Sequence, residues 1–261
     1  MRRWIAIVGA LVVVLAAAGV GVRSWILQSN STSVDELGAI ELAGIDQSAS
    51  AGASKVDPGE RPDAGIWRYE GAGRDSFEAF GGASHQFPDT IFTVVSLDED
   101  DRCAWEWFVP FVEEHTETRS MCTEDGSLLN ARFSRSMTFL GREQESRYRC
   151  DENAWRIAPS RFGRTWSWTC AEARGGVVRY SASDKGERIV TIEGQDVTTR
   201  YVEIRGTQRD RSKGNELTRL WLLESGIPAR FATRRSAAVS TPVGVIQTSE
   251  SWDYTLAKRP N

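Results

Sequence analysis

Short runs of β-branched and aromatic residues, separated by turn-forming residues, extend from Ala64 to Leu256. In the last run, Ile246, Trp252, Tyr254 and Leu256 share one parity and polar residues take the other. Alternation with a period of two marks a strand with one wet face. Similar patterns predict strands at Thr90–Leu97, Ala104–Val109, Thr116–Met121, Leu128–Ser134, Arg164–Ala171, Val177–Ser183, Arg188–Glu193, Val197–Arg205, Glu216–Leu223 and Ala229–Arg234. We therefore predict an all-β domain over residues 64–258, built as a large antiparallel curved sheet in a half-open barrel or a sandwich.

Glycine-containing turns punctuate these runs. The predicted turns are Asp125-Gly126, Gly175-Gly176, Lys185-Gly186, Glu193-Gly194, Lys213-Gly214 and Gly226-Ile227-Pro228. We also read Gly71-Ala72-Gly73 as a turn, and Asp75 to Phe80 as a single helical turn.

The N-terminus has the pattern of a membrane anchor. Arg2 and Arg3 precede an apolar run from Trp4 to Val22, and Arg23 follows it. About 20 apolar residues span a bilayer, and basic residues favour the cytoplasmic side. Residues 1–23 are therefore predicted to form a single transmembrane helix at the cell membrane, with the C-terminal domain extracytoplasmic. The alternative is a signal peptide cleaved after Ala16-Ala17-Ala18, which would give a secreted protein.

Residues 24–63 have the composition of a linker. Between Gln28 and Asp63 seven acidic residues face two basic ones, which gives a net charge of −5 without any aromatic residue. Such a segment buries too little apolar surface to offset its ordering entropy. We expect a disordered acidic linker, in which Val34 to Ile45 has the pattern of a short helix.

Four cysteines follow the linker, at Cys103, Cys122, Cys150 and Cys170. They lack the close C-x-x-C spacing of a zinc site, and an exported domain meets an oxidising environment. Two structural disulfides are predicted and no metal. The spacing favours Cys103–Cys122 and Cys150–Cys170, although four cysteines allow three pairings.

Aromatic and basic residues provide the candidate ligand-binding positions. Trp105 and Trp107, like Trp166 and Trp168, are two residues apart and so share a strand face. These pairs indicate either core packing or an apolar groove for an acyl chain or glycan. Arg200, Arg205 and Arg209 lie in a basic stretch, which is either solvated or a contact for an anionic lipid group.

Catalytic motifs are missing from the sequence. It contains no nucleophile elbow, zincin pair, phosphate loop or dinucleotide fingerprint. His115 is expected to be a solvated strand residue, and His85 has no nucleophile nearby in the sequence. The acidic run Asp98 to Asp101 is expected to be an exposed turn, with calcium binding as the alternative. We predict no enzyme activity and no cofactor.

Charge disfavours nucleic acid as a partner. Of the 32 basic and 36 acidic residues, 5 and 7 precede Ala64, which leaves 27 and 29 in the β domain. A nucleic-acid-binding domain is expected to carry a basic excess.

The C-terminal third has a recurring rhythm: a glycine turn, a Trp-Leu strand, and a Gly-Ile-Pro turn before the next strand. It is carried by Gly206, Gly214, Trp221-Leu222, Gly226 to Arg230 and the strand from Trp252 to Leu256. This part resembles bacterial periplasmic half-barrel proteins of unknown function. The whole chain resembles uncharacterised, membrane-anchored extracytoplasmic β-rich proteins of actinobacteria. The resemblance implies a lipid-binding concavity and no catalytic residues.

These observations predict a non-catalytic cell-envelope protein that binds an amphiphile, a lipid or another envelope component. The membrane is one expected partner, and an envelope protein or glycan is another. The alternative function is a structural or protein-interaction module of an envelope assembly. An extracellular hydrolase ranks third, because it would need two carboxylates facing each other across an open cleft.

Overall fold

The computed structural model describes residues 32–44, 61–78, 83–139, 142–151, 154, 157, 162–173, 175–209, 212–241 and 244–260. Nearly all of the described chain is β-strand. The strands are β1 (Gly65–Phe77), β2 (Ala83–Phe87), β3 (Thr90–Leu97), β4 (Ala104–Val112), β5 (His115–Glu124), β6 (Ser127–Phe139), β7 (Arg142–Cys150), β8 (Thr165–Glu172), β9 (Val177–Ile192), β10 (Gln195–Gln208), β11 (Ser212–Leu222), β12 (Pro228–Thr241) and β13 (Gly244–Lys258).

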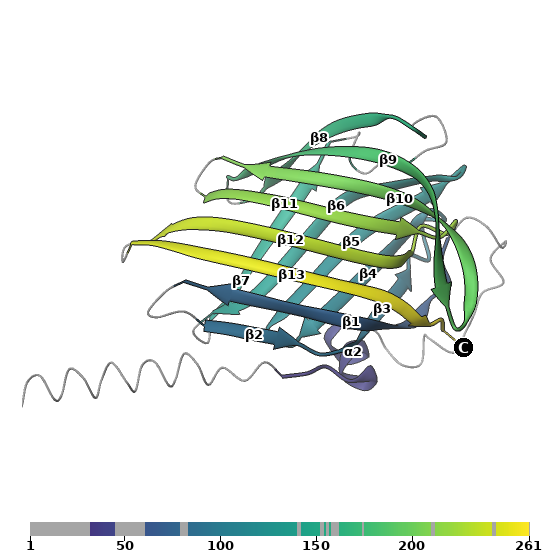
Figure 1. Ribbon diagram of the computed structural model, residues 1–261, viewed down its shortest axis with the longest axis horizontal. Helices are drawn as coiled ribbons and strands as arrows, with labels where there is room; N and C mark the ends of the chain where they lie inside the picture. Colours follow the sequence, from purple (N-terminus) through teal and green to yellow (C-terminus); the bar gives the residue numbers. More distant parts are fainter. Residues whose placement is uncertain are drawn as a thin grey trace, which may run out of the picture.

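The sheet is antiparallel and closes on itself. Neighbours in sequence pair from β3 to β13, and β1 joins β3 to β13, which makes a closed ring of twelve strands. β2 adds to the second half of β1, outside that ring. In Figure 1 β9 to β13 and β1 cross in front of β4 to β7. The all-β prediction is confirmed. The half-open barrel or sandwich is corrected to a closed barrel, because ten residues of β1, from Arg68 to Phe77, pair with β13.

The strand predictions missed β1, β2 and β7. Gly71 and Gly73 were predicted to form a turn, but they lie inside β1. β1 also continues through Asp75 to Phe77, where a helical turn was predicted. Both positions require glycine because neighbouring strands approach β1 closely. A Cβ on Gly71 would lie 2.0 Å from the Asp253 carbonyl oxygen, and one on Gly73 would lie 2.5 Å from Phe87.

Two of the predicted turns are tight two-residue hairpins. Asp125 and Gly126 join β5 to β6 with φ values of 49° and 66°, and Glu193 and Gly194 join β9 to β10 with 51° and 77°. Positive φ at both positions is the type I′ geometry that suits strand twist. Lys185-Gly186 is instead an irregularity within β9, where the β9–β10 register shifts opposite Arg200.

A short helix, α2 (Glu36–Leu42), precedes the barrel, within the range predicted for one. Asp35 caps it by accepting a hydrogen bond from the Gly38 backbone N–H at 2.8 Å. Val34 and Ala39 are buried with Val94 of β3. Residues 32–44 thus depart from the expected disorder, because this apolar contact offsets their ordering entropy.

Among the described residues, no helix is long and apolar enough to cross a bilayer. The anchor predicted over Trp4–Val22 lies outside those residues and stays a prediction.

Both predicted disulfides are formed, as Cys103–Cys122 and Cys150–Cys170. The first joins the start of β4 to β5, and the second joins β7 to β8. Paired disulfides of this kind are typical of an extracytoplasmic protein. The second lies at the weakest seam of the ring, where only three residue pairs join β7 and β8, one of them the two cysteines themselves.

Replacing Cys150 and Cys170 with Ala is expected to destabilise the protein more than replacing Cys103 and Cys122. The loops span 20 and 19 residues, so chain entropy assigns both bonds about 3 kcal/mol. Only the replacement of Cys150 and Cys170 also removes the covalent link between β7 and β8, which share just three residue pairs. Urea unfolding midpoints of the two double variants test this, and equal losses would contradict it.

Candidate functional site

One half of the barrel interior is filled by aromatic side chains. Trp105 and Trp107 are almost completely buried, and their indole N–H groups donate to Thr123 at 2.9 Å and to Thr93 at 3.1 Å. Phe231 meets Trp107 edge-on, with ring centroids 5.2 Å apart. Because both indoles are packed in this way, neither of them lines the cavity described below.

The middle of the barrel holds a set of buried charges, which we term the ion cluster. Its members all point inward and are Glu117, Arg119, Arg135, Glu216, Arg235 and Glu250. Three carboxylates thus meet three guanidinium groups, and the cluster is neutral as a whole. Buried charges persist only where they are paired in this way.

Glu117 and Arg235 make the hydrogen bonds that link the other members of the ion cluster. One oxygen of Glu117 accepts from Arg135 at 2.9 Å and from Arg235 at 3.1 Å, and the other accepts from Arg119 at 3.2 Å. Arg235 also donates to Glu216 at 3.0 Å and to Glu250. The cluster therefore connects β5, β6, β11, β12 and β13 across the barrel.

Electrostatics favour the charged forms of the cluster carboxylates and of Arg235. Burial alone would raise the pKa of Glu117, but the surrounding arginines hold it well below its usual value. The pKa values of Glu216 and Glu250 are also lowered, chiefly by Arg235, against the opposing effect of burial. The pKa of Arg235 is raised by Glu216 and Glu250, again against burial.

His115 lies beside the cluster in an aromatic cage. It was expected to be solvated but is 2% exposed, because its position on β5 faces inward. Its ring centroid lies 5.3 Å from that of Phe111, 5.5 Å from Phe87 and 6.0 Å from Trp252. Neither ring nitrogen has a hydrogen-bond partner among the described residues.

A His115→Phe variant is expected to remove part of the protein's acid sensitivity. Burial lowers the pKa of His115, with Glu250 and Glu117 opposing and Arg235 and Arg135 reinforcing that shift. As the pH falls through about 6.5, the unfolded chain takes up a proton that the folded state resists. Stability then falls by up to ~1.4 kcal/mol per pH unit until the folded pKa is reached.

The phenylalanine variant lacks that loss and is expected to be at least as stable at pH 7.5, since a buried unpaired imidazole is removed. Urea unfolding of both proteins between pH 7.5 and 5 measures the difference, because the other titrating side chains are the same in the two proteins. Parallel pH profiles of the two proteins would refute the expectation.

Asp75 and His85 form a second polar pair nearby. The His85 Nδ1 and an Asp75 oxygen are 2.9 Å apart, across the β1–β2 pairing. Burial raises the pKa of Asp75, although His85 partly opposes the shift. Asp75 pairs in register with Glu250 of β13, so this pair lies beside the ion cluster.

Beyond the ion cluster the barrel is hollow. A cavity of about 340 Å³, which we term the mouth cavity, opens where β1 and β10 end and β11 and β13 begin. Its apolar wall includes Phe77, Met137, Tyr148, Val178, Tyr180, Ala237 and Ile246. Its polar lining includes Arg135, Gln144, Ser146, Gln208, Asn215, Glu216, Arg235, Ser236, Thr248 and Glu250.

The mouth cavity exists because small residues take the inward positions of three neighbouring strands. Gly206, Gly214 and Ala237 line it from β10, β11 and β12. A Cβ on Gly206 would lie 2.6 Å from the ring of Tyr180, so that glycine also makes room for the tyrosine. Larger side chains there would fill the space, as they do at the opposite end.

The other sequence-predicted positions lie apart from the mouth cavity. Trp168 is buried and stacks on Tyr180 at 5.3 Å, and Trp166 packs against the core. Arg200 is held by Asp184 at the β9 irregularity. Arg205 pairs with Glu203 at 2.7 Å on the outer face, and Arg209 is exposed after β10. The structure therefore does not bring the tryptophans and these arginines into one site.

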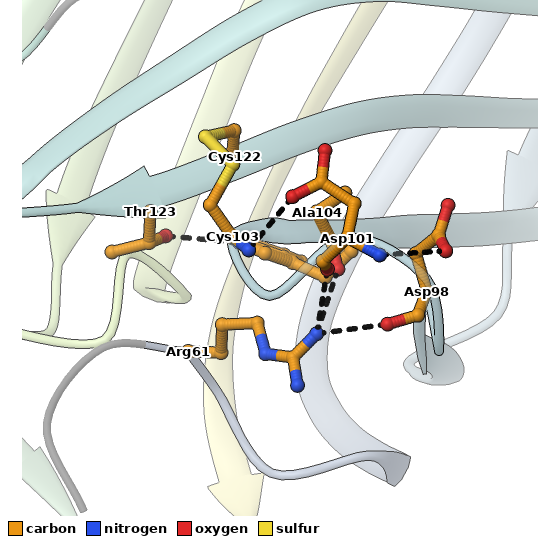
Figure 2. The surroundings of a disulfide bond; sticks show 8 residues. Arg61, Asp98, Asp101, Cys103, Ala104, Cys122 and Thr123 are labelled. Atoms are coloured by element: carbon orange, nitrogen blue, oxygen red, sulfur yellow. Dashed lines mark hydrogen bonds between the residues drawn. A yellow bond between two sulfur atoms is a disulfide. The ribbon is translucent and has the colours of Figure 1, made fainter. Parts of the chain in front are cut away.

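The acidic loop from Asp98 to Asp101 is held by an arginine. Figure 2 shows one terminal nitrogen of Arg61 donating to the carbonyl oxygens of Asp98, Asp101 and Ala104, at 3.0, 3.1 and 3.3 Å. The Asp98 and Asp101 carboxylates accept backbone N–H groups of the same loop. In the described part of the chain, no three metal-ligating side chains are grouped as a metal site would need.

The residues of the ion cluster were not among the predicted site residues, although strand parity carried a signal. Glu250 shares the parity of Trp252 and Tyr254, and Arg235 shares that of Phe231. A charge on the core-facing parity indicates a buried ion pair or a functional site. Only the fold shows that five strands bring these charges together.

No family model matches the chain, and no curated protein matches it. Among solved structures it is similar to the hypothetical lipoprotein YmcC from Escherichia coli K12. The identity is 11% and the TM-score 0.33, over 74% of this chain and 88% of that one. A likeness this distant carries no argument about fold or function. The resemblance to actinobacterial envelope proteins stays a prediction.

Proposed function

We propose that the barrel binds a small amphiphile in the mouth cavity, without catalysis. The observation that supports this proposal is a cavity with apolar walls above a floor of fixed buried charges. Ligand sites typically combine a mostly apolar lining with a few well-placed polar groups. The volume, about 340 Å³, is near the lower end of such sites and suits a short chain.

The lining suggests how the amphiphile lies. Arg135, Arg235 and Glu216 belong to the ion cluster at the inner end, whereas Phe77 and Ile246 lie toward the strand ends. A bound amphiphile would place its polar group inward and its apolar chain toward the mouth. Burial of that chain would supply about 25 cal/mol for each Å² removed from water.

The carboxylates of the site favour binding over hydrolysis. A general acid needs a raised pKa, whereas arginines lower the pKa values of Glu117, Glu216 and Glu250. Each of these side chains also accepts a hydrogen bond from an arginine.

A cavity-filling substitution tests the proposal. The full chain, held in lipid nanodiscs, is titrated with ten-carbon amphiphiles that carry a ¹³C label at the first carbon, and empty nanodiscs measure partition. The wild type is expected to bind at least one of them saturably, as read by ¹³C NMR. Ala237→Phe places a ring in the cavity and is expected to weaken binding by at least tenfold.

Ala171→Phe is the matched control, because Ala171 is exposed on the outer face of β8 and lies outside the cavity lining. It is expected to bind as the wild type does. If no amphiphile binds above the empty nanodiscs, the proposal is wrong and the interaction-module alternative gains weight. Equal losses in both alanine variants would also count against the mouth cavity.

A further inference from the structure

Arg135 has unused hydrogen-bonding capacity and lines the mouth cavity. A guanidinium carries five N–H donors. Within the described part of the chain, Arg135 donates from Nε to Glu117 at 2.9 Å, and its Nη2 lies 3.8 Å from Glu216, too far for a hydrogen bond. Arg135 lines the mouth cavity, so its terminal nitrogens are available to a ligand there.

The cluster carboxylates are more fully used. Both oxygens of Glu117 accept from arginines. The two oxygens of Glu216 accept from Thr218 at 3.0 Å and from Arg235 at 3.0 Å. Arg235 donates from all three of its nitrogens, to Glu216, Glu250 and Glu117. Among the described residues, Glu250 accepts from Arg235 through one oxygen only. The floor of the cavity therefore offers more unused donors, on Arg135, than unused carboxylate oxygens.

We infer that the ligand of the mouth cavity is a fatty acid, bound with its carboxylate inward on Arg135. This inference rests on the proposed function and specifies the head group. The planar fork of a guanidinium matches the two oxygens of a carboxylate. An ammonium group would be repelled by the positive charges of Arg135 and Arg235, which line the cavity.

The charge of the site selects a carboxylate over a phosphate. Glu216 and Glu250 line the cavity together with Arg135 and Arg235, so the lining itself is balanced. One added negative charge leaves the lining with a net charge of −1, which hydrogen bonds from the unused donors of Arg135 offset in part. A second negative charge has no further counter-charge and would be repelled by the two glutamates.

The size of the cavity limits the chain. At roughly 30 Å³ for a water-sized group, 340 Å³ holds about eleven such groups. Decanoate therefore fits with its chain inside, and longer chains would extend from the mouth.

A head-group series on the wild-type protein tests the inference. The full chain in nanodiscs is loaded with ¹³C-carboxyl-labelled decanoate, and unlabelled decanol, decyl phosphate and decylammonium compete for the site. We expect decanoate to bind at least about tenfold more tightly than each competitor, because charge-assisted bidentate bonds are strong. Labelled decanol, titrated separately, reports whether the cavity binds amphiphiles at all.

The outcomes separate the two proposals. If neither decanol nor decanoate binds, the proposed function itself fails. If decanol binds as tightly as decanoate, or if decyl phosphate or decylammonium binds more tightly, the cavity binds amphiphiles but the fatty-acid inference is overturned.

Arg135→Met provides an independent check, with Arg132→Met as its control on the exposed face of the same strand. Folding of each variant is first verified by its far-UV circular dichroism. The Arg135 variant is expected to lose the preference for decanoate over decanol, and the Arg132 variant to keep it. Retention of the preference in Arg135→Met would overturn the role of this side chain. The wild-type series decides the inference even if that variant does not fold.

Discussion

A Glu117→Gln variant is expected to lose about 3–5 kcal/mol of unfolding free energy, the usual cost of removing one partner of a buried ion pair. Glu117 accepts hydrogen bonds from Arg119, Arg135 and Arg235, and its side chain is 6% exposed. Glutamine keeps the shape but offers one oxygen in place of two, and its amide N–H₂ meets an arginine donor. Three guanidinium groups would then share two carboxylates in the interior.

Glu70→Gln is the matched control. Glu70 pairs with Arg68 on the same face of β1, and both side chains are about half exposed. Surface substitutions of this kind change stability by about 0.5 kcal/mol or less. Urea unfolding at pH 7.5 measures both variants. A Glu117→Gln loss no larger than that of Glu70→Gln would mean that the ion cluster does not stabilise the barrel.

The ion cluster also predicts the direction of acid unfolding. Arginines lower the pKa values of Glu117, Glu216 and Glu250 in the folded state. Their contribution to stability is therefore present above about pH 4.5, the value for an unfolded glutamate, and is lost as the pH falls through the lowered values. This range lies below the one in which His115 acts, so the two effects are separable.

Local patterns were sufficient for the fold class and for most strands. The alternation in β13 and the Asp125-Gly126 turn depend on residues that are adjacent in sequence, and both were predicted. β1 was missed because Gly71 and Gly73 have low strand propensity. Their presence is explained by Asp253 and Phe87, which lie far along the chain. Closure of the barrel depends on the pairing of β1 with β13, which are far apart in the sequence. Local patterns do not show that pairing, and so they predicted a half-open sheet.

The candidate site was less predictable for the same reason. Trp105 and Trp107 were correctly placed on one strand face, but parity alone does not distinguish a core face from a groove. The mouth cavity depends on Gly214 and Ala237 lying opposite each other and on Gly206 lying one inward position deeper, opposite Glu216. Pairing register determines these relative positions, and single-strand patterns do not reveal them.

A Gly71→Ala variant is expected to prevent stable closure of the barrel. The added Cβ would lie 2.0 Å from the Asp253 carbonyl oxygen and 2.8 Å from the Tyr254 Cα. Both atoms belong to the backbone of β13, so no side chain can turn aside to relieve the clash. β1 would have to move away from β13 along the pairing that closes the ring.

The expected cost exceeds 3 kcal/mol, the upper range for overpacking, because strand pairs are lost as well. Ala72→Ser is the matched control, since Ala72 is the exposed neighbour on the same strand and is expected to change stability by about 0.5 kcal/mol or less. Urea unfolding gives the stabilities, and hydrogen exchange of the β1 and β13 amides locates the damage. Wild-type protection of those amides in Gly71→Ala would contradict the close approach of the two strands, and with it the closed ring that encloses the ion cluster and the mouth cavity.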